Sequence, residues 1–216
     1  MGKSLSQLVV VDVEATCWDK NGPPKPKNEE SEIIEIGLCF LDLHSFERRQ
    51  KTSILIKPVR STVSPFCTQL TTITQEMLDR EGVTYEKAIE RVNNEFHPGD
   101  LPWASWGAYD REMFETEARR RLQPGTEELT ERRKAEPYRG MPHTLYPWSR
   151  MHTNMKHQMS LMLGRTNGEF GMAQACQQAG LRLEGTHHRG SDDSWNIAGI
   201  IAWLLKTSRA AFNPRS

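Results

Sequence analysis

The chain has 216 residues, a length typical of one domain that buries its own core. Lysine plus arginine number 28 and aspartate plus glutamate also number 28, so the formal net charge is zero, which argues against a protein whose main role is to coat nucleic acid or a membrane surface. No apolar run approaches the ~20 residues that span a bilayer, and the first residues make a poor signal peptide. Because of the missing long apolar run, we expect no membrane partner. Four cysteines without C-x-x-C spacing favour free thiols in a reducing compartment, so we expect a cytoplasmic location.

Hydrophobic patterning predicts strands early in the chain and helices later. Three apolar, β-branched runs over Leu8–Val13, Ile33–Leu41 and Thr52–Ile56 are typical of strands and favour an antiparallel meander. Asp19–Ser31 is rich in proline and charge and predicts a loop, as does the stretch 123–142. The remaining predictions are a short strand over Trp103–Trp106 and helices over Tyr85–Phe96, Asp110–Arg121, Glu169–Ala179 and Ser194–Leu205. This order of elements favours a mixed α/β layered domain.

Two acids close the first predicted strand. Asp12 and Glu14 are two residues apart, so on a strand their side chains point to the same face, at the end of a run that should be buried. Unpaired buried carboxylates are costly, so they need protons or cations, and a divalent metal ion takes oxygen ligands of this kind. The alternative is that the strand ends at Val13 and both acids face solvent.

A third acid, Asp110, follows Tyr109 and a predicted short strand, at the start of a predicted helix. A functional carboxylate is one interpretation. The alternative is a plain helix N-cap, the commonest use of aspartate at such a position.

The segment His187–Asp193 runs into the last predicted helix. Asp193 would lie in the first turn, where the helix dipole favours a carboxylate, and a glycine-containing loop can fold the His188 imidazole back towards it. The ordinary pKa of histidine suits proton transfer near neutral pH. A one-residue offset is expected to point the ring of His187 elsewhere. The alternative is a polar loop ahead of a capped helix.

Together these residues form one ordered pattern, D-x-E on a strand, then a mid-chain aspartate, then H-x-x-x-x-D at the last helix. The pattern resembles the DEDDh exonucleases, the DnaQ-like or RNase-T-like superfamily. Asp12–Cys17 is similar to the D-[FVL]-E-A-T-C opening of the Eri-type (enhanced-RNAi) branch and its bacterial relatives. Further similar segments are Pro65–Thr74, Tyr146–Pro147, His152–Lys156 and Gly185–Ala198. The resemblance covers about residues 7–206 of a single exonuclease domain over 1–216, and the stretch from about Arg119 to Thr144 matches no family segment.

The resemblance implies an RNase H-like α/β fold, with a mixed central sheet and flanking helices, and a 3′–5′ exonuclease that releases nucleoside 5′-monophosphates. It also implies two divalent ions per site, Mg²⁺ or Mn²⁺, in the manner of carboxylate-rich centres that cleave phosphodiesters. Asp12 would bridge both ions, Glu14 and Asp193 would hold the nucleophile-side ion, and Asp110 would act on the other. His188 would take the proton from the attacking water.

The resemblance further implies a set of substrate-binding residues: Ala15, Thr16, Leu70, Ile73, His152 and Lys156. The first two would offer small side chains and backbone N–H groups, the next two would pack on the terminal base, and the last two would support the site or a phosphate. Simple core packing is the alternative for Leu70 and Ile73, and a structural role is the alternative for His152 and Lys156. The basic runs Arg119–Arg121 and Arg132–Lys134 can follow a nucleic-acid backbone or form a solvated face.

The expected partner is single-stranded nucleic acid or a 3′ overhang. RNA is favoured over DNA because the nearest resemblance is to an RNA-trimming branch, although no residue visibly reads a 2′-hydroxyl. A DNA exonuclease with the same site stays open, as does a non-catalytic module that binds 3′ ends, although such a module has no reason to keep His188. The lack of dense histidine motifs such as H-E-x-x-H disfavours a small-molecule metallohydrolase. The sequence names no protein partner.

Overall fold

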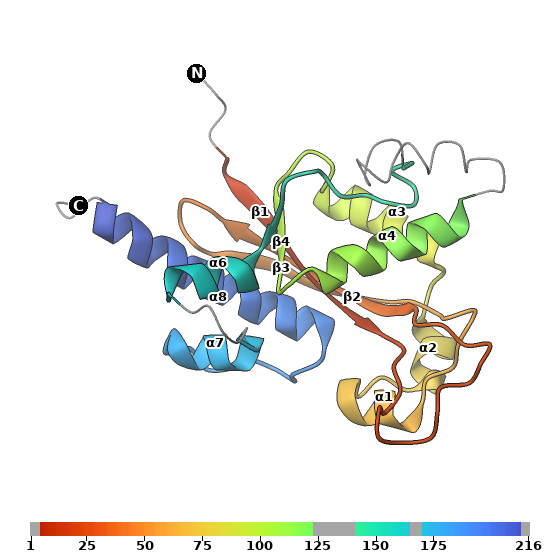
Figure 1. Cartoon of the computed structure of the whole chain (residues 1–216). Coiled ribbons are helices and arrows are strands. Elements are labelled where there is room, and N and C mark those ends of the chain that lie inside the picture. Colours follow the sequence, from red (N-terminus) through yellow and green to blue (C-terminus); the bar gives the residue numbers. More distant parts are fainter. Residues whose placement is uncertain (1–4, 123–140, 165–169, 213–216) are drawn as a thin grey trace.

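The centre of the molecule is a five-stranded sheet in the order β3-β2-β1-β4-β5 (Figure 1), seen in a computed structural model that describes residues 5–122, 141–164 and 170–212. The strands are β1 Gln7–Ala15, β2 Ile33–Asp42, β3 Arg48–Leu55, β4 Trp103–Ser105 and β5 His152–Asn154. The first three form the antiparallel meander that the sequence predicts. β4 pairs in parallel with β1, and β5 pairs in parallel with β4, so the sheet is mixed.

Helices cover both faces of this sheet (Figure 1). They are α1 Pro65–Thr71, α2 Gln75–Glu81, α3 Tyr85–Phe96, α4 Tyr109–Arg121, α6 Met155–Met162, α7 Met172–Gln178 and α8 Gly190–Phe212. Among the described ranges, no helix combines the length and the apolar content that a bilayer crossing needs. The arrangement confirms the predicted mixed sheet with flanking helices.

Alternation along β1 divides the core into two apolar layers. Val9 and Val11 pack on one face with buried residues of α3 and α4. Leu8 and Val10 pack on the other face with α6, α7 and α8. Because successive strand residues point to opposite faces, Asp12 shares the face that α8 covers. A third, smaller cluster joins α1 and α2 to β2 beyond the end of β1, through Ile34, Cys67, Ile73 and Leu78.

Several element boundaries differ from the sequence prediction. β1 runs two residues past Val13, β3 begins at Arg48, four residues before the predicted start at Thr52, and α8 begins at Gly190, four residues before the predicted start at Ser194. α7 is shorter than predicted, whereas α1, α2, β5 and α6 were not predicted at all. β5 has three residues and owes its existence to pairing with β4, which local sequence does not encode. The loop predicted over 123–142 lies almost entirely outside the described residues.

Candidate active site

β1 carries the first two acids into the protein. The strand continues through Glu14 to Ala15, so the alternative in which it ends at Val13 is wrong. Glu14 is buried and Asp12 is half-buried, both on the face where Val10 packs against α8. The apolar run that forms the strand therefore ends in carboxylates that have little access to water.

The start of α8 rests directly on the backbones of β1 and β2. A Cβ added to Gly37 would lie 1.7 Å from the carbonyl carbon of Gly190, and one added to Gly190 would lie 3.0 Å from the carbonyl oxygen of Asp12. A side chain at Gly37 would therefore displace the helix. This close approach brings Asp193, in the first turn of α8, to the acids of β1.

Glu35 ties the same helix start to β2, where it lies opposite Glu14 in the strand register. Its fully buried carboxylate accepts hydrogen bonds from the backbone N–H of Gly190 at 2.9 Å and from Nε of Arg189 at 3.1 Å. The hydroxyl of Ser53 on β3 donates a further bond at 2.5 Å. Glu35 is not among the predicted site residues, although an acid in the middle of the apolar strand IIEIG is a signal that could have found it.

Asp110 joins α4 to β1. Its Oδ1 accepts a hydrogen bond from the backbone N–H of Val13 at 2.9 Å, and its side chain is buried. The N-cap of α4 is Ala108, without a side-chain capping bond, so the alternative that Asp110 is a plain N-cap is wrong. The residue instead reaches across the fold to the strand that carries the first two acids.

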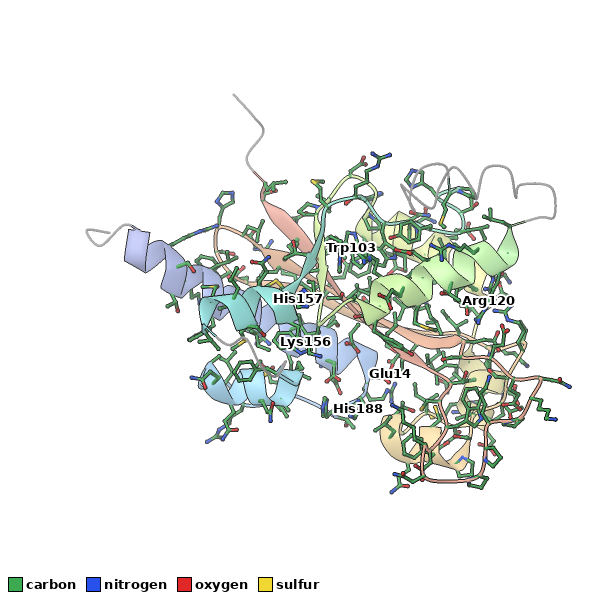
Figure 2. All side chains as sticks on the ribbon, viewed as in Figure 1. Glu14, Trp103, Arg120, Lys156, His157 and His188 are labelled. Atoms are coloured by element: carbon green, nitrogen blue, oxygen red, sulfur yellow. The ribbon has the colours of Figure 1, made fainter. Side chains whose placement is uncertain are left out.

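Carboxylate oxygens of Asp12, Glu14 and Asp193 lie within 4.8 Å of one another. We call these three residues the carboxylate group; Asp110 stands beside it, and Glu14 is labelled in Figure 2. Burial, and then the negative charge of the neighbouring acids, raises the pKa of Asp12 well above its ordinary value and that of Glu14 to about 8. Burial also raises the pKa of Asp193, and it raises that of Asp110 to about 6. These shifts mark negative charge that lacks compensation.

Two neighbouring histidines meet Asp193. The backbone N–H of His188 donates to Asp193 Oδ2 at 3.0 Å, and His187 Nδ1 lies 3.0 Å from the same oxygen. The expectation that the ring of His187 points elsewhere is therefore wrong. His188 has a φ of 64°, which turns the chain back on itself, and the two rings stack with centroids 3.9 Å apart. Burial first, and then the charge of His187, lowers the pKa of His188.

The sequence is similar to those of known exonucleases. The RNase T exonuclease family matches residues 9–104. The fruit fly (Drosophila melanogaster) 3′-5′ exonuclease Snipper is 36% identical over 89 residues, which is 41% of this chain and 31% of the relative. Human ERI1 exoribonuclease 3 is 28% identical over 209 residues, which covers 91% of this chain and 53% of the relative. The chain thus spans about half or less of the length of these curated relatives.

Solved structures share the fold over almost the whole chain. The nuclease domain of 3′hExo, described as a DEDDh family member bound to rAMP, superposes with a TM-score of 0.71 at 21% identity, covering 96% of this chain and 95% of that one. The chain shares the fold of this DEDDh family member. A 3′-exonuclease that recognises the 3′ end of the histone mRNA stem-loop gives a TM-score of 0.70 at 22% identity and covers 94% of this chain and 64% of that one. Pop2p of S. pombe, in a form with Mg²⁺ and Mn²⁺ bound, gives a TM-score of 0.62 at 14% identity. The match covers 91% of this chain and 82% of Pop2p.

The predicted substrate-binding residues near β1 differ in exposure. Ala15 ends β1 and is buried. Thr16 is fully buried; its backbone N–H donates to Glu32 O at 2.9 Å and its hydroxyl accepts from the backbone N–H of Glu32 at 3.0 Å. Leu70 lies half-buried on α1, whereas Ile73 is fully buried in the cluster that joins α1 and α2 to β2. Leu70 thus keeps surface that a ligand can reach, and Ile73 packs in the core.

The other two predicted substrate-binding residues flank β5 and α6. His152 packs on Trp103 with ring centroids 4.2 Å apart, and its Nε2 lies 3.0 Å from Ser105 Oγ. Burial lowers the pKa of His152 to about 4, so the ring is neutral near pH 7. Lys156 is half-buried in the first turn of α6 (Figure 2).

The basic run at the end of α4 is paired within the protein. Arg120 and Arg121 both contact the buried Glu117, and Arg119 bonds to Glu115. These guanidinium groups are therefore engaged by acids of their own helix. The second basic run, Arg132–Lys134, lies outside the described residues.

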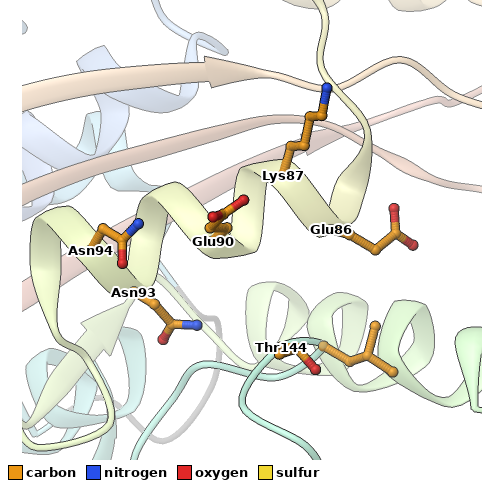
Figure 3. Close-up of a pocket in the computed structure, with 7 residues that line it drawn as sticks. Glu86, Lys87, Glu90, Asn93, Asn94 and Thr144 are labelled. Carbon is orange, nitrogen blue, oxygen red and sulfur yellow. The ribbon is translucent and has the colours of Figure 1, made fainter.

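Two surface pockets lie apart from the carboxylate group. One, of about 520 Å³, opens between the loop after β1 and α1 and includes the rings of Trp18 and Phe66. The other, of about 420 Å³, lies between α3 and the segment around Thr144, where Asn93 donates to His143 O at 2.9 Å (Figure 3). The first is the closer in sequence to Glu14, because Trp18 follows the end of β1 by three residues.

Proposed function

We propose that this chain is a metal-dependent 3′–5′ exonuclease that removes nucleotides from the free 3′ end of RNA and releases nucleoside 5′-monophosphates. The observation that carries the proposal is the buried carboxylate group with Asp110 beside it, because carboxylates with raised pKa values in one place call for divalent cations. Relatives named exoribonucleases that align over about nine tenths of the chain support the reaction.

The donor set fits Mg²⁺ or Mn²⁺, which prefer oxygen ligands, and we propose two ions per site. In this proposal Asp12 would serve both ions, while Glu14 and Asp193 would hold one of them; the three carboxylates lie within 4.8 Å of one another. Asp110, with one carboxylate oxygen bonded to the Val13 N–H, would act on the other ion, directly or through water. Such ions supply an activated water, neutralise the phosphate charge and stabilise the leaving 3′-oxygen.

His188 is the proposed general base, the group that takes the proton from the attacking water. A base must be neutral to accept a proton, and the lowered pKa of His188 keeps it neutral at physiological pH. The bond from its backbone N–H to Asp193 fixes the loop on the carboxylate group and leaves both ring nitrogens to other partners.

The proposed substrate is single-stranded RNA or a 3′ overhang. Its terminal nucleotide would lie beside Ala15, Thr16 and Leu70, and the pocket lined by Trp18 and Phe66 offers aromatic rings on which a base can stack. Ile73 would support this region from the core next to α1, and His152 and Lys156 would support the site or a phosphate. A DNA exonuclease is the second candidate, because the relative Snipper is named an exonuclease without mention of RNA.

Free thiols at all four cysteines fit a reducing compartment, and we propose that the protein acts in the cytoplasm.

The test is product analysis with matched end-labelled RNA and DNA strands, single and double, under Mg²⁺ and under Mn²⁺. We expect 5′-monophosphates released from the 3′ end, faster from RNA. A blocked 3′-hydroxyl should stop the reaction. Degradation of circular strands as fast as linear ones, or attack from the 5′ end, would overturn the proposal. Binding of 3′ ends without hydrolysis would favour the non-catalytic module.

His188→Ala should lower the single-turnover rate by about 10²–10⁴, the usual contribution of a positioned acid–base group, with less effect on substrate binding. The rate of the unmodified protein should rise with pH as His188 loses its proton and then level off. Single-turnover assays across a pH series measure both effects. A variant with the full rate and the same pH profile would remove His188 from the role of base.

A further inference from the structure

Asp193 belongs to two clusters of metal-ligating side chains. With Asp12 and Glu14 it forms the carboxylate group, and with His187 and His188 it forms a second cluster, which we call the histidine group. In each cluster the ligand atoms lie within 4.8 Å of one another. The first offers oxygen alone, whereas the second offers two imidazole nitrogens and one oxygen, so the two clusters suit different ions.

The loop conformation holds the histidine group together. The positive φ of His188 brings two consecutive side chains to the same side of the chain, where their rings stack with an interplanar angle of 20°. His187 Nδ1 lies 3.0 Å from one carboxylate oxygen of Asp193 and 3.2 Å from the other. The backbone N–H of His188 also bonds to this carboxylate, which fixes its orientation. Two rings and a carboxylate thus converge on one place.

This convergence has the composition of a transition-metal site. Zinc binds imidazole nitrogen at about 2.0–2.1 Å and carboxylate oxygen at similar range, and sites with three protein ligands and one water are common. Ligand atoms around a tetrahedral zinc ion are about 3.4 Å apart at those bond lengths. The His187 side chain is 39% exposed, so it has room to rotate and close the remaining gap. Magnesium prefers oxygen ligands and is not expected here.

We propose that His187, His188 and Asp193 form a second metal site, for zinc and similar transition ions, that competes with the carboxylate group for Asp193. His187 supplies the ligand that distinguishes the two sites, since it has no place among the metal-binding carboxylates. The further consequence, which rests on the proposed function, is inhibition: an ion in the histidine group would engage both the proposed general base His188 and the shared Asp193.

Zinc binding is tested directly, without substrate, on the full chain freed of metal by a chelator. Zn²⁺ is titrated in competition with a chromophoric zinc chelator, and Co²⁺ replaces it for visible absorption, which reports nitrogen ligands and tetrahedral geometry. The variants are His187→Ala, Asp12→Ala and, as matched control, His44→Ala, an exposed histidine in the turn between β2 and β3. Circular dichroism confirms that each variant is folded.

We expect one zinc ion with equal affinity in the unmodified chain and in His44→Ala. His187→Ala should bind it at least about tenfold more weakly, since loss of even an outer-shell partner costs 10–100-fold, and should lose the Co²⁺ absorption. Asp12→Ala should keep both properties. The proposal is overturned if no zinc binds, if His187→Ala binds zinc as well as His44→Ala does, or if Asp12→Ala loses zinc while His187→Ala retains it.

The inhibitory consequence has its own readout. Mg²⁺-dependent hydrolysis should fall in proportion to zinc occupancy in the unmodified chain, and the zinc concentration for half inhibition should rise in His187→Ala by the same factor as the dissociation constant. Hydrolysis that ignores bound zinc would overturn the inhibitory role alone. A chain that binds zinc but hydrolyses nothing under Mg²⁺ would refute the proposed function and leave the zinc site standing.

Discussion

Acids are buried in two parts of this molecule, and their surroundings are opposite. Glu117 on α4 is 1% exposed, yet its carboxylate meets three guanidinium groups, from Arg60, Arg120 and Arg121. Glu14 is nearly as buried, at 8%. Within the described ranges, no lysine or arginine forms an ion pair with Glu14, Asp12 or Asp110.

The difference separates acids whose charge the protein compensates with arginines from acids whose charge it leaves without such partners. Around Glu117 the protein supplies the positive charge itself, so breaking the pair leaves an uncompensated buried charge. Around Glu14 the compensation is missing, and the raised pKa values of the carboxylate group record the cost. Removing an acid should therefore harm stability in the first region and activity in the second.

The largest expected effect is on turnover. Asp12→Ala or Asp193→Ala should lower it by about 10³-fold or more, because each removes metal-binding charge that contributes several kcal/mol to the transition state. The metal-free variants should stay folded and become no less stable, since mutually repelling acids are removed. Steady-state assays under excess Mg²⁺ measure turnover, and urea denaturation measures the free energy of unfolding. Near-normal turnover in either variant would show that the site is misassigned.

The next effect is on stability alone. Glu117→Ala should lower the free energy of unfolding by about 3–5 kcal/mol, the usual cost of removing one partner of a buried ion pair. Glu112→Ala, at an exposed position on the same helix, is the control and should change it by less than about 0.5 kcal/mol. Urea denaturation measures the free energy of unfolding of both variants. An equal decrease in the two would mean that the arginines around Glu117 gain new partners.

The pH dependence of stability gives a third contrast. The ordinary pKa of glutamate is 4.5 and that of folded Glu14 is about 8, so between these values the folded state holds a proton that the unfolded state releases. The stabilisation present below pH 4.5 is then lost as pH rises towards 8, by up to about 1.4 kcal/mol per pH unit for this group. Asp110 adds to the slope up to about pH 6.

Added Mg²⁺ should remove this slope, because it binds the deprotonated carboxylates. Urea denaturation over a pH series, with chelator or with Mg²⁺, measures the effect. Glu14→Gln without metal should have a flatter slope than the unmodified chain. An unchanged slope in that variant would place the proton elsewhere.

The smallest effect concerns Glu35, which shares a property with each of the two kinds of buried acid. It sits beside the carboxylate group but is paired with Arg189. Glu35→Gln keeps the shape and loses the charge, so the free energy of unfolding should fall by about 1–3 kcal/mol, as for hydrogen bonds to charged groups. Glu47→Gln, in an exposed pair with Arg49, should cost less. A loss no larger than that of Glu47→Gln would remove Glu35 from the anchoring of α8.

The acids and His188 could be predicted from sequence because each stands at an element boundary marked by a change of pattern. Asp12 ends an apolar run, and Asp193 opens an amphipathic helix. The role of Glu35 could not be predicted because its partner Arg189 lies 154 positions away, and only the packing of the start of α8 on β2 brings the two residues together. The position of the His187 ring could not be predicted, because neighbouring side chains point to opposite sides only in an extended chain. The positive φ of His188 departs from that conformation.

The short helices α1 and α2 and the short strand β5 could not be predicted for a different reason. α1 and α2 have seven residues each, too few for a clear helical period, although Ser64 and Thr74 cap them with side-chain bonds that the sequence allows. The three-residue β5 is held by β4. Local pattern thus predicted which acids and histidine would come together, and tertiary contacts decide which residues surround them.

The contact of Gly37 with Gly190 also determines where this fold can change in length. α8 is seated by backbone against backbone, so the separation of Asp12 from Asp193 does not depend on the span of the connection that leads into the helix. Arg182 and Leu183, both exposed in that connection, therefore mark a place where an inserted segment, such as a binding module or a fluorescent reporter, should leave the spacing of the acids intact. A single methyl group added at Gly37 has far less mass than such an inserted segment. It would nevertheless displace the start of α8 and so change the distance between Asp12 and Asp193.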